Sequence, residues 1–481
     1  MLLSIAERCY KAVMSNVRDF GARGDGARDE TSDIIHAVEQ GDGVLRFPPG
    51  TYRISRTIEI DLSKRGFHAI EGSSGTVRIL MEGAGPAFRL TGNHCGTGDP
   101  LSVIESVWKT ERMPAIRQIE IAGAHPDADG VELCFTMQAI LEGLLIRQCR
   151  NGIRLHQRNR NVLISGCHVY HNTGVGIFLD AVNLHQINIT GNHISYNRSG
   201  GIRIERSEVR NLQITGNDIE YNNFEAHKTE PEVVADILID ASAAKSSVRE
   251  VTIASNTIQA TYSPGGANIR IIGSGPDGAR KAGMLTITGN IIGSQETSVH
   301  LKDCQHLALT GNFLYSSQYR NLWIENCGDI VFGANSIGHN ADYGDKQLAT
   351  GIRIERSQRC NLNGFSIQDA KASANTVDGA IKLDRRALLE IIDCNAITIS
   401  NAQLTDGAPH AVLVENSSGV SITGCSIQET RAEPKTTSAI RWTGDGSRNL
   451  VAINVFQLPE RVKAIDADAG AMVIENGNVP G

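Results

Sequence analysis

Ionisable side chains recur at fixed positions of short alternating segments, and this pattern indicates a charged surface that could carry acid–base chemistry. The heptapeptide GIRIERS occurs at residues 201–207 and again at residues 351–357. Read with a period of two, it places its isoleucines on one face of an extended strand and Arg203 and Glu205 on the other. The repeated strand therefore predicts one buried face and one face that presents charge.

Carboxylates and one imidazole fall into a single outward column when these segments are aligned. We expect His156, Asp180, Glu205 and Asp240 to stand on successive strands, which lie ~4.8 Å apart in a sheet. Carboxylates on adjacent strands suit a nucleophile and an acid/base pair, whereas Asp180 and Asp240, roughly 9.6 Å apart, would leave room for a water and suit inversion. Stacked carboxylates also repel, which raises the pKa of one member as a general acid requires. We assign Glu205 or Asp180 as the acid, Asp240 as the base or nucleophile, and His156 as a further catalytic candidate.

The same column has a structural explanation. An exposed sheet face needs charged side chains, and Arg–Glu neighbours on it are solvated pairs that contribute little. We favour this explanation for the second GIRIERS copy, around Arg353 and Glu355, and a functional site for the first copy.

Other side chains of this face would bind substrate. Arginines suit carboxylate or sulfate groups, and exposed aromatic rings either offer a flat surface to a sugar or pack under a loop. His227 belongs to the longest insertion, which should lie over the first copy. The substrate-binding candidates are Arg154, Arg203, Arg270, His227, His300, Lys302, Trp323 and Phe178.

The same residues permit β-elimination. Carboxylates could bind Ca²⁺, which would neutralise a uronate and acidify its C5 proton, and Arg203, His156 or Lys302 would then act as the base. The acidic stretch HPDADGVEL at residues 125–133 could supply further ligands, although turn chemistry also explains it. We therefore predict no metal and no cofactor for hydrolysis, and Ca²⁺ only for a lyase.

These candidates must be positioned by a repeat that begins near Arg117. Steps such as TGNHI and TGNFL place asparagines 22 to 39 residues apart, and each coil contains three short extended runs. Asparagine suits the tight bend because it tolerates left-handed backbone and its amide can pair with the next asparagine in the stack. This pattern predicts an all-β fold, a right-handed parallel β-helix of about 12 coils with three strands each. The recurring asparagines are Asn192, Asn217, Asn256, Asn290, Asn312 and Asn335.

Insertions locate the working face of this β-helix. Most fall between the second and third runs of a coil, at residues 222–236, 338–350 and 369–379, and another falls at residues 274–283. Loops gathered beside one sheet usually wall a groove on it. The sheet in question carries both GIRIERS copies.

Bulk composition excludes several classes of protein. A net charge of −7 argues against a nucleic-acid binder, and no apolar run approaches the ~18 residues that span a bilayer. The cysteines are scattered singly without metal-type spacing, which predicts buried free thiols. The first residues lack the features of a secretory signal, so we expect a cytoplasmic protein unless a leader has been omitted.

The N-terminal segment resembles the opening of pectate-lyase-superfamily β-helices, which include rhamnogalacturonase-like enzymes, epimerases and phage tailspike endoglycosidases. The matching pieces are DFGA at residues 19–22, GDG at 24–26, DET at 29–31 and FPPGTY at 47–52. The resemblance implies a strand, a turn, a capping helix begun by Asp29 or Thr31, and a second strand, which together close the end of the solenoid. It also implies a carbohydrate-active enzyme. The DPHE motif of alginate epimerases and the paired signatures of polygalacturonases are absent.

We predict an N-terminal helix and cap over residues 1–55, a β-helix over 56–457 and a C-terminal tail over 458–481. The expected function is cleavage of glycosidic bonds in a poly- or oligosaccharide by carboxylate acid/base hydrolysis. The alternatives are a polysaccharide lyase and a non-catalytic carbohydrate-binding or structural module. We expect no nucleic-acid or membrane partner, and either a monomer or a homotrimer with outward apolar residues at its interface. Those interface candidates are Leu238, Ile272 and Leu413.

Overall fold

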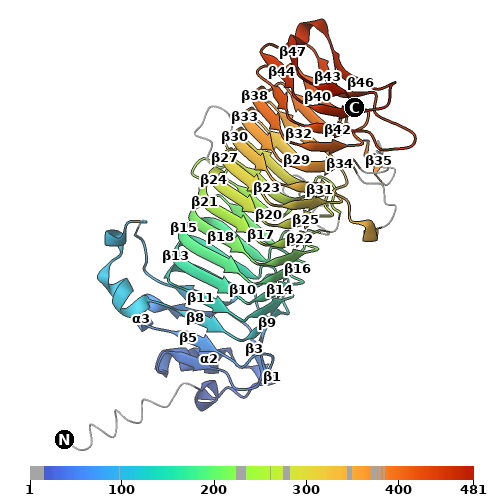
Figure 1. Ribbon diagram of the computed structural model, residues 1–481. Coiled ribbons are helices and arrows are strands. Elements are labelled where there is room, and N and C mark those ends of the chain that lie inside the picture. Colours follow the sequence, from blue (N-terminus) through green and yellow to red (C-terminus); the bar gives the residue numbers. More distant parts are fainter. Residues whose placement is uncertain are drawn as a thin grey trace, which may run out of the picture. The chain divides into compact units, whose positions relative to one another are not determined.

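The computed structural model describes residues 16–96, 98–223, 234–260, 262–274, 282–343, 349–369, 376–377, 381–382 and 385–480. The chain forms two compact units, Met1–Phe224 with Ala244–Ser246, and Glu225–Ala243 with Ser247–Gly481. In both units the chain winds through coils of three strand runs, and each strand pairs in parallel with its counterpart in the next coil (Figure 1). We name the three faces of a unit after these first, second and third runs. The predicted all-β parallel β-helix is confirmed.

The first unit begins with a cap and continues as a stack of coils. Its helical elements are η2 (Val17–Phe20), α2 (Thr31–Gln40), α3 (Leu62–Arg65), η3 (Pro100–Ser102) and η4 (Val107–Glu111). The first face contains β2 (Val44–Arg46), β5 (Ala69–Glu71), β8 (Ala115–Arg117), β11 (Ile140–Glu142) and β18 (Glu208–Thr215). The second contains β1 (Asp25–Asp29), β3 (Gly50–Ile54), β6 (Val77–Met81), β9 (Glu120–Gly123), β12 (Leu145–Arg147), β14 (His168–Tyr170), β16 (His193–Ser195) and β19 (Asp218–Glu220). The third contains β4 (Ile58–Asp61), β7 (Gly85–Thr91), β10 (Ala128–Met137) and β17 (Ile202–Glu205), while β13 (Ile153–Ser165) and β15 (Ile177–Thr190) run from the third face onto the first.

The second unit repeats the same coil. Its first face contains β21 (Ser247–Ala254), β24 (Ala282–Thr288), β27 (Gln305–Thr310), β30 (Gly328–Gly333), β33 (Gln358–Asn363), β38 (Asn395–Ser400), β41 (Ser421–Thr423), β44 (Asn449–Ala452) and β47 (Val473–Asn476). The second contains β22 (Thr257–Gln259), β25 (Ile291–Gly293), β28 (Phe313–Tyr315), β31 (Ser336–Gly338), β34 (Ser366–Gln368), β39 (Gln403–Thr405), β42 (Ser426–Gln428), β45 (Val455–Gln457) and β48 (Val479–Pro480). The third contains β20 (Ala235–Asp240), β23 (Ala267–Ile272), β26 (Thr297–Lys302), β29 (Arg320–Glu325), β32 (Ile352–Glu355), β37 (Leu389–Ile392), β40 (His410–Glu415), β43 (Ser438–Thr443) and β46 (Lys463–Ala467). The remaining elements are η7 (Ala341–Tyr343), η8 (Ala469–Ala471) and the antiparallel pair β35 (Thr376–Val377) and β36 (Ile381–Lys382).

The cap forms as its sequence predicts, with one difference at the helix start. Helix α2 begins at Thr31, and Asp29 accepts the backbone N–H of Thr31 at 2.9 Å. The N-cap position itself belongs to Glu30, whose buried carboxylate instead accepts the backbone N–H of Gly24 at 3.0 Å. Glu30 therefore links the GDG turn to the start of helix α2 by a hydrogen bond.

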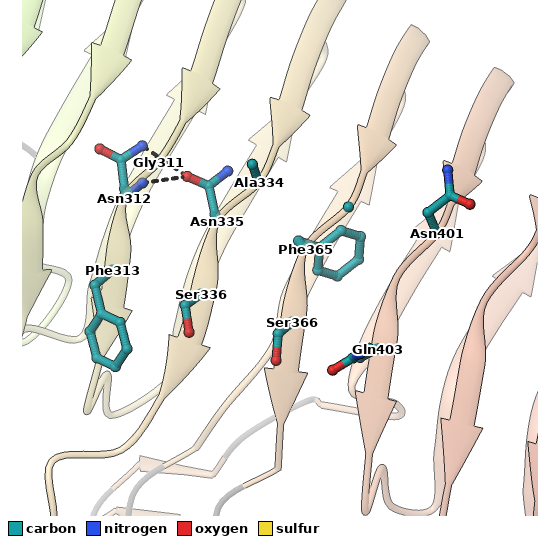
Figure 2. Close-up of a pocket in the computed structure, with 11 residues that line it drawn as sticks. Gly311, Asn312, Phe313, Ala334, Asn335, Ser336, Phe365, Ser366, Asn401 and Gln403 are labelled. Atoms are coloured by element: carbon teal, nitrogen blue, oxygen red, sulfur yellow. Dashed lines mark hydrogen bonds between the residues drawn. The ribbon is translucent and has the colours of Figure 1, made fainter.

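Asparagine ladders hold one bend of successive coils. In the second unit, both the backbone and side-chain amides of Asn290 donate to Oδ1 of Asn312 at 3.0 Å, and Asn312 reaches Asn335 in the same way (Figure 2). The predicted pairing is confirmed. The left-handed residue, however, is the one before each asparagine, as Gly311 with φ of 67° shows. The ladder stops where Phe365 takes the next position and packs against Phe332.

Burial confirms one expectation about apolar residues and corrects another. The cysteines of the described residues are free, and all except Cys95 are buried, as predicted. Leu238 and Leu413 are also buried, so they offer no surface to a trimer interface. No helix of the described residues is long and apolar enough to cross a membrane.

Candidate functional site

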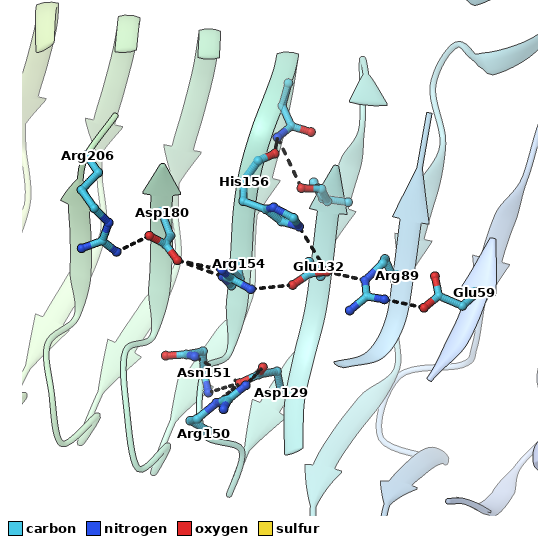
Figure 3. A network of polar contacts seen from close by, with 12 residues as sticks. Glu59, Arg89, Asp129, Glu132, Arg150, Asn151, Arg154, His156, Asp180 and Arg206 are labelled. Atoms are coloured by element: carbon cyan, nitrogen blue, oxygen red, sulfur yellow. Dashed lines mark hydrogen bonds and ion pairs between the residues drawn. The ribbon is translucent and has the colours of Figure 1, made fainter. Parts of the chain in front are cut away.

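An alternating row of acids and bases crosses the third face of the first unit (Figure 3). Arg89 bridges Glu59 and Glu132, and Arg154 donates to Glu132 at 3.0 Å and to Asp180 at 2.8 Å. Each arginine lies between carboxylates of neighbouring coils, so the charges along the row compensate one another. The predicted column of carboxylates is thus interleaved with guanidinium groups.

The row continues into the first GIRIERS copy. Asp180 and Glu205 lie on adjacent strands, as predicted, because β15 pairs with β17 in that register. Arg206, one residue beyond the strand, pairs with both of them, and Arg203 donates to Glu205 at 2.5 Å. Arg203 also lies 5.9 Å from the ring centre of Phe178, so this ring contacts a guanidinium group rather than standing bare.

The expectation that stacking raises a carboxyl pKa is wrong for Asp180. Burial raises the pKa of Asp180, but the hydrogen bonds from Arg154 and Arg206 outweigh burial and hold it below its ordinary value. A carboxylate held ionised in this way does not suit the general acid that we assigned to Asp180.

His156 stands in register with Cys134 of β10, and its imidazole approaches Glu132 of that preceding coil rather than Asp180 (Figure 3). A register shift in the β13–β15 pairing falls between Leu155 and Gln157, and the imidazole Nε2 lies 3.3 Å from Glu132. Cys134 first, and then Glu132, raise the pKa of His156 to about 9. His156 is therefore protonated near neutral pH, which contradicts its assignment as a base for elimination.

The pair of His156 and Glu132 makes the free energy of unfolding depend on pH in a direction that can be tested. The pKa of His156 rises from 6.5 to about 9 on folding. The contribution of protonated His156 to the free energy of unfolding is therefore complete below its unfolded pKa and is lost as pH rises through about 9. We expect the urea midpoint of the wild-type protein to fall between about pH 6 and about pH 9.5, and this fall to be reduced in His156→Gln. An unchanged fall in the variant would contradict the assignment.

The acidic stretch at residues 125–133 is used for ion pairing. Asp129 accepts from Arg150 at 2.6 Å and from the backbone N–H of Asn151 at 2.9 Å (Figure 3). Asp127 lies 3.3 Å from Arg150. Within the described ranges, no group of histidines, cysteines and carboxylates is arranged to hold a metal ion. Contacts with Arg150 and Asn151 of the next coil therefore account for Asp127 and Asp129.

A cavity of about 660 Å³ opens on the third face of the second unit. Strands β20, β23, β26, β29 and β32 pair in a register that stacks their outward residues in two parallel columns. Predicted site residues from both columns line the cavity: Asp240, Arg270, His300, Lys302 and Trp323. Its other lining residues are Ser242, Gly265, Ile272, Glu325, Glu355 and Arg356.

A polar relay runs along the floor of this cavity. Arg270 Nε donates to Nδ1 of His300 at 3.2 Å, so the proton of the neutral imidazole belongs on Nε2, which lies 3.4 Å from Glu325. Burial lowers the pKa of His300 and favours this neutral form. His300, together with Lys302 and Arg356, holds the pKa of Glu325 at about 2 against burial. Glu325 is thus ionised at any ordinary pH.

Trp323 lies between this relay and the second GIRIERS copy. Its ring stacks on His300 at 4.5 Å between centroids, and its indole N–H donates to Glu355 at 2.9 Å. Glu355 also accepts from Arg353 at 2.8 Å. These contacts fix the orientation of an aromatic side chain on the wall of the cavity.

Asp240 differs from the other carboxylates of the cavity. Its Oδ1 accepts the backbone N–H of Ser242 at 2.8 Å. Among the residues that the structure describes, no basic side chain forms an ion pair with Asp240, whereas Glu325 and Glu355 both pair with Arg356. Asp240 is therefore the cavity carboxylate without an ion pair among the described residues.

Comparison with known proteins identifies the family. A family model described as a right handed beta helix region matches residues 115–258 and 235–456. The chain belongs to the right-handed β-helix family. A second model, Rhamnogalacturonase A/epimerase, pectate lyase-like, matches residues 14–84 of this β-helix protein, where the sequence resembles that group.

Individual relatives of the β-helix protein agree with its fold. The N-terminal fragment of bacteriophage phi29 gene product 12 superposes with a TM-score of 0.55 at 14% identity, covering 97% of this chain and 74% of that one. The pre-mature form of that product gives 0.54 at 14% identity and covers 94% and 59%. A probable glucan endo-1,3-beta-glucosidase of Arthroderma benhamiae is 40% identical over 62 residues, and the match covers 10% of this chain and 7% of that protein. This chain therefore matches only a small part of the glucosidase.

Both GIRIERS copies of the β-helix protein use their residues in the same way. Arg203 and Arg353 bind the glutamate two positions later, while Arg206 and Arg356 reach back to a carboxylate of the preceding coil. The serine that ends each copy accepts a backbone N–H from that coil, as Ser357 does from Cys327 at 3.0 Å. The motif recurs because it closes the same turn and balances the same charges. The second copy, for which we favoured a purely solvating role, also lines the cavity.

Sequence reasoning missed other members of the site. Glu325 gave only the ordinary signal of a charged outward position, and Arg356 comes directly after its strand, where the alternation gives no signal. Glu296 lies in the turn before β26 and accepts the N–H of Gly265, a cavity residue, at 2.8 Å. Burial raises the pKa of Glu296. His227, a predicted substrate-binding residue, lies outside the described residues.

Proposed function

We propose that this protein is a carbohydrate-active enzyme that cleaves glycosidic bonds in the cavity of its second unit. The observation that carries the proposal is the joint placement of Asp240, Glu325 and Trp323 in one cavity of about 660 Å³. A volume of this order suits a small-molecule or sugar unit, and an indole wall offers the flat surface on which a pyranose packs. The match of residues 14–84 to a model named for a rhamnogalacturonase and an epimerase supports the substrate class.

The two carboxylates take different roles because their surroundings differ. Glu325 stays ionised at working pH, since His300, Lys302 and Arg356 surround it, and so it would act as the nucleophile or stabilise positive charge on the sugar ring. Asp240 has no ion pair in the described part of the chain, and so it would exchange the proton with the leaving group or the attacking water. This assignment keeps Asp240 in the reaction centre and moves Asp180, Glu205 and His156 out of it.

A polysaccharide lyase is the second candidate, and a specific observation favours it. Arg270, Lys302 and Arg356 give the cavity three cationic side chains, which suit the carboxylate of a uronate. Elimination would require a base to remove the C5 proton, with or without Ca²⁺. The same cavity would serve either reaction on an acidic sugar.

One screen separates these functions. Acidic and neutral polysaccharides would be incubated with the protein, with and without Ca²⁺, while reducing ends and the absorbance of unsaturated uronates are read together. Reducing ends without new absorbance are the result expected for a hydrolase, and reducing ends with it would establish a lyase. Absence of both signals across the panel would contradict enzymatic cleavage and favour a carbohydrate-binding or structural module.

A further inference from the structure

An insertion in the first unit covers part of its strand stack. Residues 92–96 and 98–114 lie between β7 and β8, outside the regular coil, and contain η3 and η4 (Figure 1). Val103 and Val107 of this insertion form a buried cluster with Met137 at the end of β10. Within it, the buried carboxylate of Glu111 accepts the backbone N–H of Asn93 at 2.6 Å. The insertion is therefore docked on the sheet at a defined place.

Basic side chains gather at the edge of this docked insertion. The register of β13, β15 and β18 puts Arg160, His185 and Arg210 at one position of three successive coils. Arg158 projects from the same side of β13 as Arg160, two residues earlier. Arg160 donates to the carbonyl of Asp99 at 3.4 Å, so the insertion touches the row directly.

The loop backbone also closes against His185. Gly98 lies so near the imidazole that a Cβ at this position would fall 2.7 Å from Nδ1. Only the bare glycine backbone fits beside His185, and a side chain there would displace the ring. The row of basic groups is thus bounded by the sheet on one side and by residues 98–99 on the other.

Three members of this group have no partner of their own. Within the described residues, the Arg158 guanidinium and the His185 imidazole form no hydrogen bond or ion pair. His94, on the insertion, is 1% exposed and neither of its ring nitrogens has a hydrogen-bond partner. A buried polar group without a partner is costly, and it indicates a ligand that the group would bind.

The charge around these groups is positive. The pKa of His94 is lowered to about 4, first by burial and then by the nearby Arg158, Arg160 and His185. The pKa of His185 is also lowered, first by burial and then by Arg210, Arg158 and Arg160, while Glu208 acts in the opposite direction. Glu208 accepts from Asn183 at 2.9 Å and pairs with Arg210 at 3.9 Å, and Glu111 is engaged within the insertion. No acid in the described part of this region neutralises Arg158.

We propose that Arg158, His185 and His94, with Arg160 and Arg210 beside them, bind an oxyanion of the carboxylate or sulfate type. Guanidinium and imidazole N–H groups form strong charge-assisted hydrogen bonds with such oxygens. The oxyanion is either a free inorganic anion or the acidic substituent of a saccharide, and the chemistry of recognition is the same for both. This site lies in the first unit and does not depend on the function proposed for the second.

Calorimetric titration tests the site directly. Sodium sulfate, trigalacturonate and a neutral glucan trisaccharide would each be titrated into the full-length protein at matched ionic strength. We expect sulfate and trigalacturonate to bind, the neutral sugar not to bind at this site, and Arg158→Gln to weaken anion binding by at least about tenfold. Arg56→Gln is the matched control, because Arg56 is an exposed arginine of the same unit without an ion pair among the described residues.

Each outcome decides part of the proposal. Tighter binding of trigalacturonate than of sulfate would identify the saccharide as the source, and the reverse would identify a free anion. Sulfate should also raise the pKa values of His94 and His185, which NMR titration of the imidazole protons would follow. Failure of both anions to bind, or equal weakening by Arg158→Gln and Arg56→Gln, would overturn the proposal. Loss of Asp240 should leave this binding unchanged, so the result is separate from that for the second unit.

Discussion

Replacing Asp240 by asparagine is expected to lower kcat by about 10²- to 10⁴-fold while KM changes little. The side chain would keep its size and its hydrogen bond from the backbone of Ser242, which the structure places at 2.8 Å. It would lose the ability to accept and return a proton. Since Asp240 forms no ion pair among the described residues, the substitution leaves no basic side chain there without its partner.

Asp180→Asn is the matched control for this prediction. Asp180 lies on the same kind of strand run, but Arg154 and Arg206 hold it in the polar row of the first unit. We expect Asp180→Asn to lower the urea midpoint and to leave kcat within about threefold of the wild-type value. Initial rates on the polysaccharide found by the screen, measured with folded variants, would check both substitutions. Loss of activity in Asp180→Asn with retention in Asp240→Asn would place the reaction in the first unit.

Replacing Glu390 by glutamine is expected to destabilise the second unit by about 3–5 kcal/mol. The side chains of Arg320 and Glu390 are 2% and 1% exposed, and their charged groups lie 3.2 Å apart. Removing the carboxylate takes away the acid that lies 3.2 Å from the buried guanidinium of Arg320, and the loss of a partner from a buried pair costs far more than the loss of an exposed pair. Urea unfolding followed by circular dichroism would measure the change.

Two variants make this result interpretable. Replacing both partners together, Arg320→Met with Glu390→Leu, should restore most of the stability, because no buried charge then remains. Asp329→Asn breaks the exposed pair of Asp329 with Arg359 and should cost less than about 1 kcal/mol. Equal losses of unfolding free energy in Glu390→Gln and Asp329→Asn would show that the buried pair stabilises the protein no more than the exposed pair does.

The fold was predictable because the coil repeats a local rule. Alternating isoleucines and the small-residue step before each asparagine depend only on neighbours in sequence, so the outward columns of β23, β26, β29 and β32 could be read directly. The third-face strand that follows β32 could not be read in this way. The segment around Lys382 has the sequence pattern of a third run, but the strand that pairs with β32 is β37, where Glu390 lies in register with Arg353.

The electrostatic state of the site was less predictable for a physical reason. Arg206 and Arg356 come directly after their strands and have φ of 53° and 50°. Their side chains therefore do not follow the inward–outward alternation of the strand, and they reach carboxylates of the preceding coil. A sequence pattern gives the column on which a carboxylate stands, but not which guanidinium from a turn will neutralise it. For this reason Asp180 was overrated as an acid, while Glu325 was not assigned a role.

Tryptophan fluorescence during an oligosaccharide titration tests the central claim most directly, because only three tryptophans are present. Trp323 lines the cavity of the second unit, Trp442 is 1% exposed, and Trp108 lies in the insertion of the first unit. We predict a saturable change in wild-type protein and in Trp108→Phe, and its loss in Trp323→Phe. A signal that survives in Trp323→Phe but disappears in Trp108→Phe would contradict the claim that sugar binds in the cavity of the second unit.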